Sequence, residues 1–545
     1  MSKQNGYKIV LTASDVEMSN YRDNPFLAFS GAFSYRIPVW TTKNVIWRTV
    51  PLNNDGISSS LAPYGLRKVE AALLNYGFKQ EDVITVQAKH LKKVIGPETK
   101  IVAISSMDPL GSAYVSFTYG TFSGFGGIPC TFYYFQQLTN TLQKILKNLS
   151  PKVIVGGTGS WQINKAAREM YGIDHIIIGE GDALAGEIFD KIIKGEEVPE
   201  VIDIKMSPKL EEIPTIVKPS IHGSVEISRG CGRMCQFCTP TMHKKRDIPL
   251  ENILKEVEVN VKNEQKLITL ATEDCLIYRC KMDGKFVPNA PEVLKLFKGL
   301  ISVPGVEAVQ PAHISLTPAV VNPKLIEDLS ELMHDYCRYN YNYKPSLSAE
   351  TGIETGSVRL MKKYLKGKCL PYEPEEWPDI IRQSVGILED NNWGLVGTML
   401  IGLPEETEDD SIKNIEVVDD LFKARIFFVP LLFANLHECI LRNKKRALFD
   451  TLNNTQLEFF LRCWEHNLYM WKDIWLKPFE HNQGINFTQT MITKFVFSAV
   501  YLTFFSWRRD SLSKIKHELF REIAGVQPIQ VIRNGIRTLK SNLLT

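Results

Sequence analysis

Three cysteines near the middle of the chain have the spacing of a metal-binding loop. They lie in Cys231-Gly-Arg-Met-Cys235-Gln-Phe-Cys238, directly after a strand-like run over residues 224–228. Thiolates are the ligands that suit iron–sulfur clusters. Four cysteines would bind all four irons of a [4Fe-4S] cluster, whereas three leave one iron free to bind another molecule. The segment therefore predicts a [4Fe-4S] site that does chemistry.

Two alternatives compete with this interpretation: a zinc site and a set of buried thiols. Structural zinc normally has four ligands, and His243, five residues after Cys238, could supply the fourth. The other cysteines lack the grouped spacing of a second cluster, and together they favour a reducing, cytoplasmic compartment. These scattered residues are Cys130, Cys275, Cys280, Cys337, Cys369, Cys439 and Cys463.

The CxxxCxxC spacing, with Phe237 before the last cysteine, resembles the radical S-adenosylmethionine (SAM) superfamily. The resemblance implies that Cys231, Cys235 and Cys238 bind the cluster and that the open iron chelates the amino and carboxylate groups of SAM. It also implies that an electron cleaves SAM to give a 5′-deoxyadenosyl radical. A ferredoxin-like or flavodoxin-like reductant protein is the implied partner.

Residues 206–435 must position this loop, and their pattern predicts six strand–helix units after a proline-containing linker. Six such units make a partial (β/α)6 barrel, with its active groups at the carboxyl ends of the strands. The predicted strands cover residues 224–228, 267–271, 308–316, 346–349, 395–401 and 426–432.

The family resemblance assigns SAM contacts to residues at these strand ends. Glu273 and Asp274 are implied near the SAM amino group, although the Gly-Gly-Glu sequence of the family is missing. The segment Gly352-Ile-Glu-Thr-Gly-Ser matches the motif that reaches the SAM ribose and carboxylate, and a later glycine resembles the adenine-side motif. The residues assigned by these two motifs are Glu354, Gly356, Ser357 and Gly402.

Ordinary structural roles compete with several of these assignments. Any one carboxylate can instead cap a helix N-terminus, and this alternative is strongest for Glu405 and Glu406. His313 is predicted either as a core histidine or as a substrate contact inside the barrel. The aromatic stretch 337–343 is predicted to line a substrate channel or to form an interdomain loop.

Residues 1–205 alternate apolar strand runs with amphipathic helices, which predicts a Rossmann-like parallel sheet covered on both faces. Ligands of such sheets bind beyond the carboxyl ends of the strands. Glycines lie at two of these ends, in Gly156-Gly-Thr-Gly159 and in Gly179-Glu-Gly-Asp182. The segment 117–129, rich in glycine and aromatic residues, is predicted to be a loop near that pocket.

Residues 60–190 resemble the cobalamin-binding-type domain that precedes the barrel in one radical SAM class, through "PYGLRKVEAAL", "ISSMDPLG", "VIVGGTG" and "IIIGEGD". Domains that ligate cobalt carry Asp-x-His-x-x-Gly, which His90, His175 and His222 do not match. Some relatives bind cobalamin without this histidine and others keep only the fold. The resemblance therefore leaves cobalamin as a possible cofactor.

Residues 436–545 are predicted to form a helical domain, with helices over 455–473 and 514–524. The run 495–507 is the most apolar of the chain, and Arg508 and Arg509 follow it. At thirteen residues it is too short to span a bilayer. It is predicted to pack as a buried helix, to line an apolar substrate tunnel, or to lie at a membrane surface.

The composition limits partners and location. The 545 residues carry a net charge of only +3, with 64 Lys and Arg against 61 Asp and Glu, so no nucleic-acid partner is predicted. The N-terminus lacks the apolar segment of a signal peptide, and no apolar run is long enough to span a membrane. We expect a cytoplasmic protein with peripheral membrane contact as a further possibility.

Within the class that joins a cobalamin-type domain to a radical SAM barrel, the chain resembles the archaeal tetraether-lipid ring synthases. The apolar C-terminal region and the missing cobalt-ligand motif support this resemblance. It implies an archaeal enzyme that forms cyclopentane rings in isoprenoid tetraether lipids. The main alternative is a cobalamin-dependent radical SAM C-methyltransferase, and a third is a non-catalytic redox or cobalamin sensor. No catalytic side chain is predicted beyond the cluster and SAM contacts.

Overall fold

The first part of the chain forms a six-stranded parallel sheet with the order β2-β1-β3-β4-β5-β6, here called the N-terminal sheet. The structure is a computed structural model that describes residues 5–36, 46–122, 128–341 and 344–471. The strands of this sheet are β1 (Ile9–Ala13), β2 (Val83–Thr85), β3 (Ile101–Ser105), β4 (Lys152–Gly156), β5 (His175–Ile178) and β6 (Val201–Asp203).

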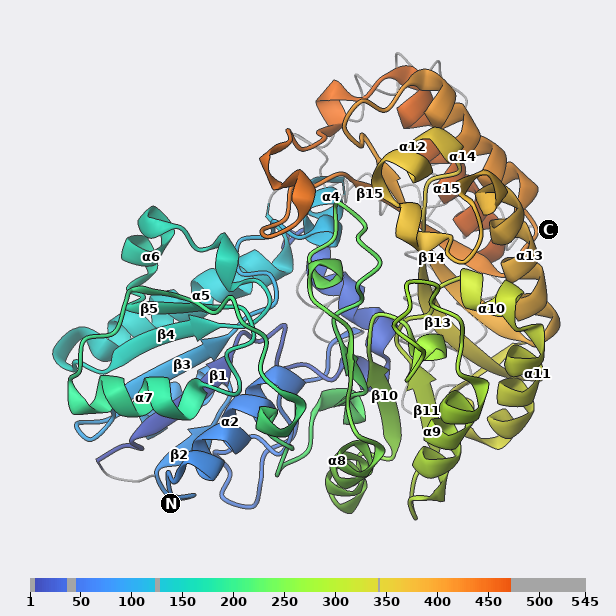
Figure 1. The fold of residues 1–545 in the computed structure, drawn as a ribbon. Coiled ribbons are helices and arrows are strands. Elements are labelled where there is room, and N and C mark those ends of the chain that lie inside the picture. The colour runs from blue at the N-terminus through green and yellow to red at the C-terminus, as the bar shows by residue number, and fades with distance from the viewer. Residues whose placement is uncertain (1–4, 37–45, 123–127, 342–343, 472–545) are drawn as a thin grey trace, which may run out of the picture.

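Alternation along the strands gives the N-terminal sheet two apolar faces. Ile9 and Leu11 of β1 pack with α2 (Tyr64–Tyr76) and α7 (Ala185–Lys194). Val10, between them, packs with the helices of the opposite face. Those helices are α3 (Leu91–Val94), α5 (Cys130–Ile145) and α6 (Lys165–Tyr171). The predicted doubly covered sheet is therefore present (Figure 1).

The second part of the chain forms six parallel strands, here called the barrel, in two sheets that meet at a bridge between His313 and Glu350. The short antiparallel strand β12 (Tyr339–Tyr341) pairs with β13 outside this series. The barrel strands are β7 (Val225–Glu226), β10 (Leu267–Ala271), β11 (Ala308–Pro311), β13 (Lys344–Glu354), β14 (Trp393–Ile401) and β15 (Ile426–Leu432).

Helices follow or cover the barrel strands, as the strand–helix pattern predicts (Figure 1). A two-stranded antiparallel ribbon, β8 (Ser228–Arg229) with β9 (Arg246–Asp247), continues from β7. The helices of this part are α8 (Leu250–Lys262), α9 (Ala290–Ser302), α10 (Thr317–Val321), α11 (Pro323–Leu332), α12 (Val358–Tyr364), α13 (Trp377–Asp390), α14 (Glu408–Asp420) and α15 (Asn454–Trp471).

Side chains from two distant helices cover the free edge of β15. Asn467 of α15 accepts from the Phe428 N–H at 2.8 Å and donates to the Phe428 carbonyl at 2.6 Å. From the N-terminal part, α4 (Tyr114–Phe122) contributes Thr118, which accepts from the Leu432 N–H at 2.9 Å. Exposed strand edges invite unwanted pairing, and here α4 and α15 satisfy the edge of the partial barrel (Figure 1).

The predicted fold class is confirmed, with corrections to single segments. Residues 117–122, predicted to be a loop, belong to α4, because Thr118 and Tyr119 bond to β15 and stabilise a helix that the composition does not favour. Most of the predicted C-terminal domain, including the run 495–507 and the helix 514–524, lies outside the described residues. Within the part that is described, no helix has the length and apolar character needed to cross a membrane.

Candidate active site

The three cysteines lie on one short loop, the cysteine loop (Cys231–Cys238), which follows β8. Cys235 is buried, and Cys231 and Cys238 are half-buried. The Cys231 N–H donates to the Pro240 carbonyl at 3.2 Å, and the Cys238 N–H donates to the Cys235 carbonyl at 3.1 Å. Gly232 has a φ of +77°, a conformation that glycine adopts without strain. A tightly turned loop thus carries all three free thiols.

Two cations act on these thiols. Burial raises the pKa of Cys235 to about 11, and the charge of Lys368 opposes that rise. Burial likewise raises the pKa of Cys231, and Arg233 opposes it. Positive neighbours favour the thiolate form that binds metals. The donor set and its charges therefore fit an iron–sulfur cluster held by thiolates.

The zinc alternative requires His243 as a fourth ligand. Its Nε2 atom lies 3.3 Å from Glu438 Oε2, so this ring nitrogen has a partner from a distant part of the chain. Across the described ranges, no three His, Cys, Asp or Glu side chains are grouped to hold a single metal ion. The engagement of His243 with Glu438 counts against the zinc site.

Glu273 and Asp274 follow β10, as expected, but only one of them is free. The Asp274 carboxylate lies 2.8 Å from Arg233 Nη2 and accepts from the Leu276 N–H at 3.1 Å. The Glu273 side chain has no hydrogen bond or ion pair with any residue in the described ranges, and burial raises its pKa. Glu273 is thus the carboxylate that remains available to a cationic ligand.

Glu354 ends β13 with a φ of +66° and is buried. Its Oε1 atom lies 3.4 Å from Lys368 Nζ and 3.4 Å from the Thr398 hydroxyl on the adjacent strand. Burial lowers the pKa of Lys368, but the charges of Glu354 and Cys235 outweigh this and raise it overall. Lys368 therefore links the cysteine loop to the end of β13.

Gly356 and Ser357 bond within the protein. The Gly356 N–H donates to Asn414 Oδ1 at 2.7 Å, and the Ser357 hydroxyl donates to Asp410 at 2.5 Å. Ser357 also caps α12 by accepting from the Leu360 N–H. These contacts hold α12 against α14, and the SAM contacts of Gly356 and Ser357 stay predictions.

Gly402 begins the turn after β14 and has a φ of +77°. Its N–H donates to Glu406 Oε2 at 2.6 Å, so Glu406 fixes this turn. The cap of α14 is Thr407, not either glutamate. Glu405 is exposed and pairs with Lys363. The adenine contact of Gly402 therefore stays a prediction.

Helix α4 brings a tyrosine from the N-terminal part to the cysteine loop. The Tyr114 hydroxyl donates to the Phe237 carbonyl at 3.2 Å, and the two rings meet edge to face with centroids 6.1 Å apart. Phe237 directly precedes Cys238. Because α4 follows the carboxyl end of β3, this contact joins the ligand-binding edge of the N-terminal sheet to the predicted cluster site.

A second link between the two parts lies on the other side of the cysteine loop. Arg229, two residues before Cys231, lies 2.9 Å from Glu180, 2.5 Å from Asp182 and 2.8 Å from Glu226. Burial lowers the pKa of Arg229, but these carboxylates raise it overall. The sequence pattern predicts that Glu180 and Asp182 lie beside a ligand pocket. In the structure both carboxylates belong to this interdomain ion network.

The glycines at the strand ends approach the protein's own backbone. A Cβ atom on Gly159 would lie 2.2 Å from the Met107 carbonyl oxygen, and one on Gly179 would lie 2.4 Å from the Ile204 carbonyl oxygen. Nearby, Glu17 Oε2 and Asp108 Oδ2 are buried without a hydrogen-bond partner. These two acceptors, rather than the glycines, fit a ligand that donates N–H groups.

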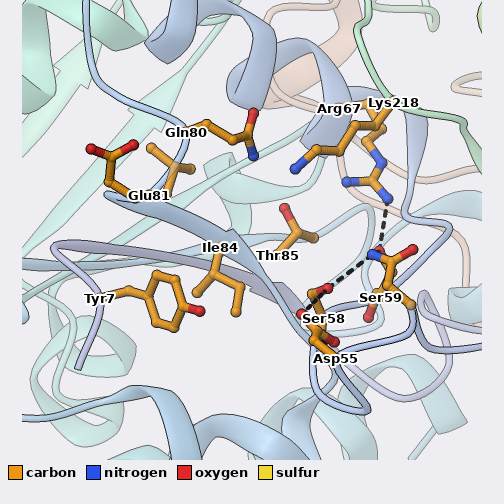
Figure 2. A pocket seen from close by; sticks show the side chains of 12 residues that line it. Tyr7, Asp55, Ser58, Ser59, Arg67, Gln80, Glu81, Ile84, Thr85 and Lys218 are labelled. Carbon is orange, nitrogen blue, oxygen red and sulfur yellow. Dashed lines mark hydrogen bonds between the residues drawn. The ribbon is translucent and has the colours of Figure 1, made fainter. Parts of the chain in front are cut away.

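A pocket of about 350 Å³ lies elsewhere, beside the edge strand β2 (Figure 2). It is lined by the whole length of β2 (Val83–Thr85) and by residues before β1 and β2, such as Tyr7 and Glu81, so it lies along the outer edge of the sheet, whereas ligands of these sheets bind beyond the carboxyl ends of the strands. Its buried Arg67 already pairs with Glu70 at 2.5 Å and donates to the Ser59 carbonyl. We therefore place the candidate site at the cysteine loop.

Sequence reasoning missed Lys368, Arg233 and Tyr114 as members of the site. Arg233 stands inside the cysteine motif, so its position was a usable signal. Lys368 follows α12 in a lysine-rich stretch, and Tyr114 lies on a helix of the other sheet. Neither has a sequence pattern that places it beside the cysteines.

No family model matches the chain. The tRNA-2-methylthio-N(6)-dimethylallyladenosine synthase of Thermotoga petrophila is 22% identical over 282 residues, covering 51% of this chain and 58% of that protein. The enzyme of the same name from Fusobacterium nucleatum is 25% identical over 284 residues, covering 50% and 59%. The chain thus spans less than two thirds of the length of these relatives.

The radical S-adenosylmethionine methyltransferase TsrM from Kitasatospora setae has a similar fold. Its structure with tryptophan and a SAM analogue gives a TM-score of 0.52 at 12% identity, covering 80% of this chain and 75% of TsrM. Its structure with cobalamin and a [4Fe-4S] cluster gives 0.51 at 13% identity, covering 80% and 74%. This likeness confirms the fold class.

Proposed function

We propose that this chain is a radical SAM enzyme that binds a [4Fe-4S] cluster through Cys231, Cys235 and Cys238. The observation that carries the proposal is the set of three thiols on one loop, flanked by Lys368 and by the free carboxylate of Glu273. When bound, the cluster supplies the electron that cleaves SAM into a radical able to remove hydrogen from a substrate C–H bond.

The charges of the site suit the ammonium and carboxylate groups of SAM. Glu273 would hold the ammonium group, because its carboxylate has no partner among the described residues. Lys368 would hold the carboxylate group, since its ammonium lies beside Cys235 and has only Glu354 at 3.4 Å as an ion-pair partner in the described ranges. Asp274, committed to Arg233, would fix the loop rather than bind SAM.

For the reaction that follows, we favour methyl transfer with cobalamin at the carboxyl end of the N-terminal sheet. Corrin rings carry many amide N–H donors, which fit the unpartnered oxygens of Glu17 and Asp108. Bound methylcobalamin would supply the methyl group. Tyr114, through Phe237, connects this end of the sheet to the cysteine loop. The substrate would meet both cofactors between these two edges.

Ring formation in an isoprenoid tetraether lipid is the second candidate. The apolar run 495–507 favours it, and a lipid substrate would explain peripheral membrane contact. A ferredoxin-like or flavodoxin-like reductant belongs to either proposal. A sensor would bind the cofactors without consuming SAM.

The test is an anaerobic reconstitution of the full chain with iron and sulfide, followed by SAM and dithionite. We expect about four irons per chain, from the cluster composition, and formation of 5′-deoxyadenosine. Cys235→Ala should lose both, while Cys463→Ala, a buried cysteine outside the loop, should keep both. Unchanged SAM cleavage in Cys235→Ala would refute the assignment. With substrate present, formation of S-adenosylhomocysteine would favour methyl transfer, as would the visible absorption of bound cobalamin. Tetraether lipids that become lighter, with no S-adenosylhomocysteine formed, would favour ring formation.

A further inference from the structure

Glu350 lies within β13, and Gly352, two residues later, is on the same face of the strand. A Cβ atom on Gly352 would lie 2.0 Å from Glu354 Oε1, so the Glu354 side chain lies over this face too. Its N–H donates to the Ala312 carbonyl at 2.9 Å, and its own carbonyl accepts from the Ile314 N–H at 2.9 Å. On the other side, β13 pairs Glu350 with Val396 of β14. With its backbone fixed between two neighbours, Glu350 directs its carboxylate to the interior of the barrel.

The Glu350 side chain has no hydrogen bond or ion pair with any residue of the described ranges. Burial raises its pKa to about 7, and the negative charge of Glu273 adds to this rise. The nearest ring, His313, cannot supply a positive charge near neutral pH, because burial and then Lys368 lower its pKa to about 4. Glu350 therefore faces the barrel interior as an acceptor without a protein cation.

The cations that act on this region are each paired with another carboxylate: Lys368 with Glu354 at 3.4 Å, and Arg233 with Asp274 at 2.8 Å. The carboxylates of Glu273 and Glu350 therefore remain without a cationic partner among the described residues. SAM carries two positive groups: the ammonium, which the proposed function assigns to Glu273, and the sulfonium, which must lie beside the cluster that reduces it. A positive group beside Glu350 would stabilise its ionised form, and no residue in the described ranges supplies one.

The layer one step deeper in the barrel also holds an unpaired polar group. The Thr269 hydroxyl has no hydrogen-bond partner, although Thr269 is only 7% exposed. Thr269 pairs with Gln310 of β11, whose amide donates to the Ser348 carbonyl two residues before Glu350. Buried hydroxyls are almost always hydrogen-bonded. The unpaired hydroxyl and the unpaired carboxylate thus lie in adjacent layers of one barrel interior.

Small side chains leave space beside Glu350. Ala271 ends β10, and Ala312 follows β11, next to the Glu350 backbone. Both alanines and Glu350 are partly accessible to solvent, although they lie within the barrel. A substrate group that enters the barrel interior can therefore reach the carboxylate past these small side chains.

We propose that Glu350 binds a positively charged nitrogen of the substrate, and that the substrate is an amine or another nitrogen cation rather than a wholly apolar chain. This inference rests on the proposed function, because that function assigns the ammonium of SAM to Glu273. A saturated lipid chain has no positive group that could bind Glu350, so a cation bound there would distinguish the two substrate classes.

The test measures binding of n-butylammonium and of neutral 1-butanol to the reconstituted protein with SAM, by ligand-observed NMR. We expect the wild-type protein to bind butylammonium at least tenfold more tightly than butanol. Glu350→Gln should weaken butylammonium binding at least tenfold and leave SAM affinity unchanged, since hydrogen bonds to charged groups are among the stronger ones. Glu408→Gln, at an exposed position, is the matched control and should bind as the wild type does.

Equal binding of the two probes to the wild-type protein would overturn the inference, as would unchanged butylammonium binding in folded Glu350→Gln. If that variant does not fold, Glu350→Asp decides: it keeps the charge and should retain the preference for butylammonium over butanol. Iron content and SAM cleavage are measured on the same samples. A wild-type protein that binds butylammonium but neither holds iron nor cleaves SAM would refute the proposed function alone.

Discussion

Replacing Glu350 by glutamine is predicted to stabilise the protein by an amount that depends on pH. Glutamine has nearly the shape of a protonated glutamate but carries no charge at any pH. In the folded protein burial and Glu273 raise the pKa of Glu350 from 4.5 to about 7. The unfolded chain keeps the ordinary value, so the folded state binds the proton more tightly.

The sign and size follow from this difference. A raised pKa contributes stability that is fully present below pH 4.5 and is lost as the pH rises through about 7. At 1.36 kcal/mol per pH unit the loss is at most about 3.4 kcal/mol. Because Glu350 is partly accessible to solvent, screening reduces this to roughly 2 kcal/mol. Glu350→Gln should therefore exceed the wild type by about 2 kcal/mol at pH 8 and by much less at pH 5.5.

The assay is guanidinium unfolding of the full chain without cofactors, followed by fluorescence between pH 5.5 and 8.5. The transition of the barrel is compared between wild type, Glu350→Gln and the exposed control Glu408→Gln. The control should show no pH-dependent difference. A Glu350→Gln protein that is no more stable than wild type at pH 8 would show that the carboxylate is solvated or paired, and would refute the reasoning.

Three further changes test the contacts around the cysteine loop. Arg229→Met leaves Asp182 and Glu226 without their ion-pair partner, while Glu180 keeps Arg246. It should lower the free energy of unfolding by about 3–5 kcal/mol, measured by denaturant unfolding at pH 7.5; less than 1 kcal/mol would mean that the network is solvated. Gly367→Ala would place a Cβ atom 1.8 Å from the Arg233 carbonyl oxygen and should reduce the iron bound per chain, whereas Gly386→Ala, in open space on α13, should not. Tyr114→Phe loses one hydrogen bond to Phe237, worth about 1 kcal/mol. It should change the electron paramagnetic resonance spectrum of the reduced cluster and leave the iron content unchanged. An identical spectrum would mean that Tyr114 does not act on the cluster.

The strands were predictable from sequence because their apolar runs are long and β-branched. β3 matches the predicted run 101–105 at both ends, and β10 and β15 match 267–271 and 426–432. β13 is longer than predicted, since Glu350 and other polar residues face the barrel interior and interrupt the apolar pattern. β6 was missed because it is three residues long and largely exposed.

The contacts of the predicted site residues were harder to foresee, since they depend on partners far along the chain. Nothing near Asp182 indicates that its carboxylate meets Arg229, which is 47 residues away. The motif around Ser357 is visible in the sequence, but the bond of its hydroxyl to Asp410 is not. α4 looked like a loop because its helix depends on tertiary bonds to β15. Motifs located the site, whereas tertiary pairing decided which side chains remain free.

The contacts that join the two parts at the ends of the cysteine loop also limit how a substrate can enter. Arg229 holds the chain just before Cys231 to the N-terminal sheet, and Tyr114 holds Phe237 just before Cys238. A hinge motion that separated the two parts would break both contacts and expose the Arg229 carboxylates without their cation. Breaking buried ion pairs costs several kcal/mol. Substrate entry should therefore leave the parts docked and proceed between them or through the barrel interior, where Glu350 lies.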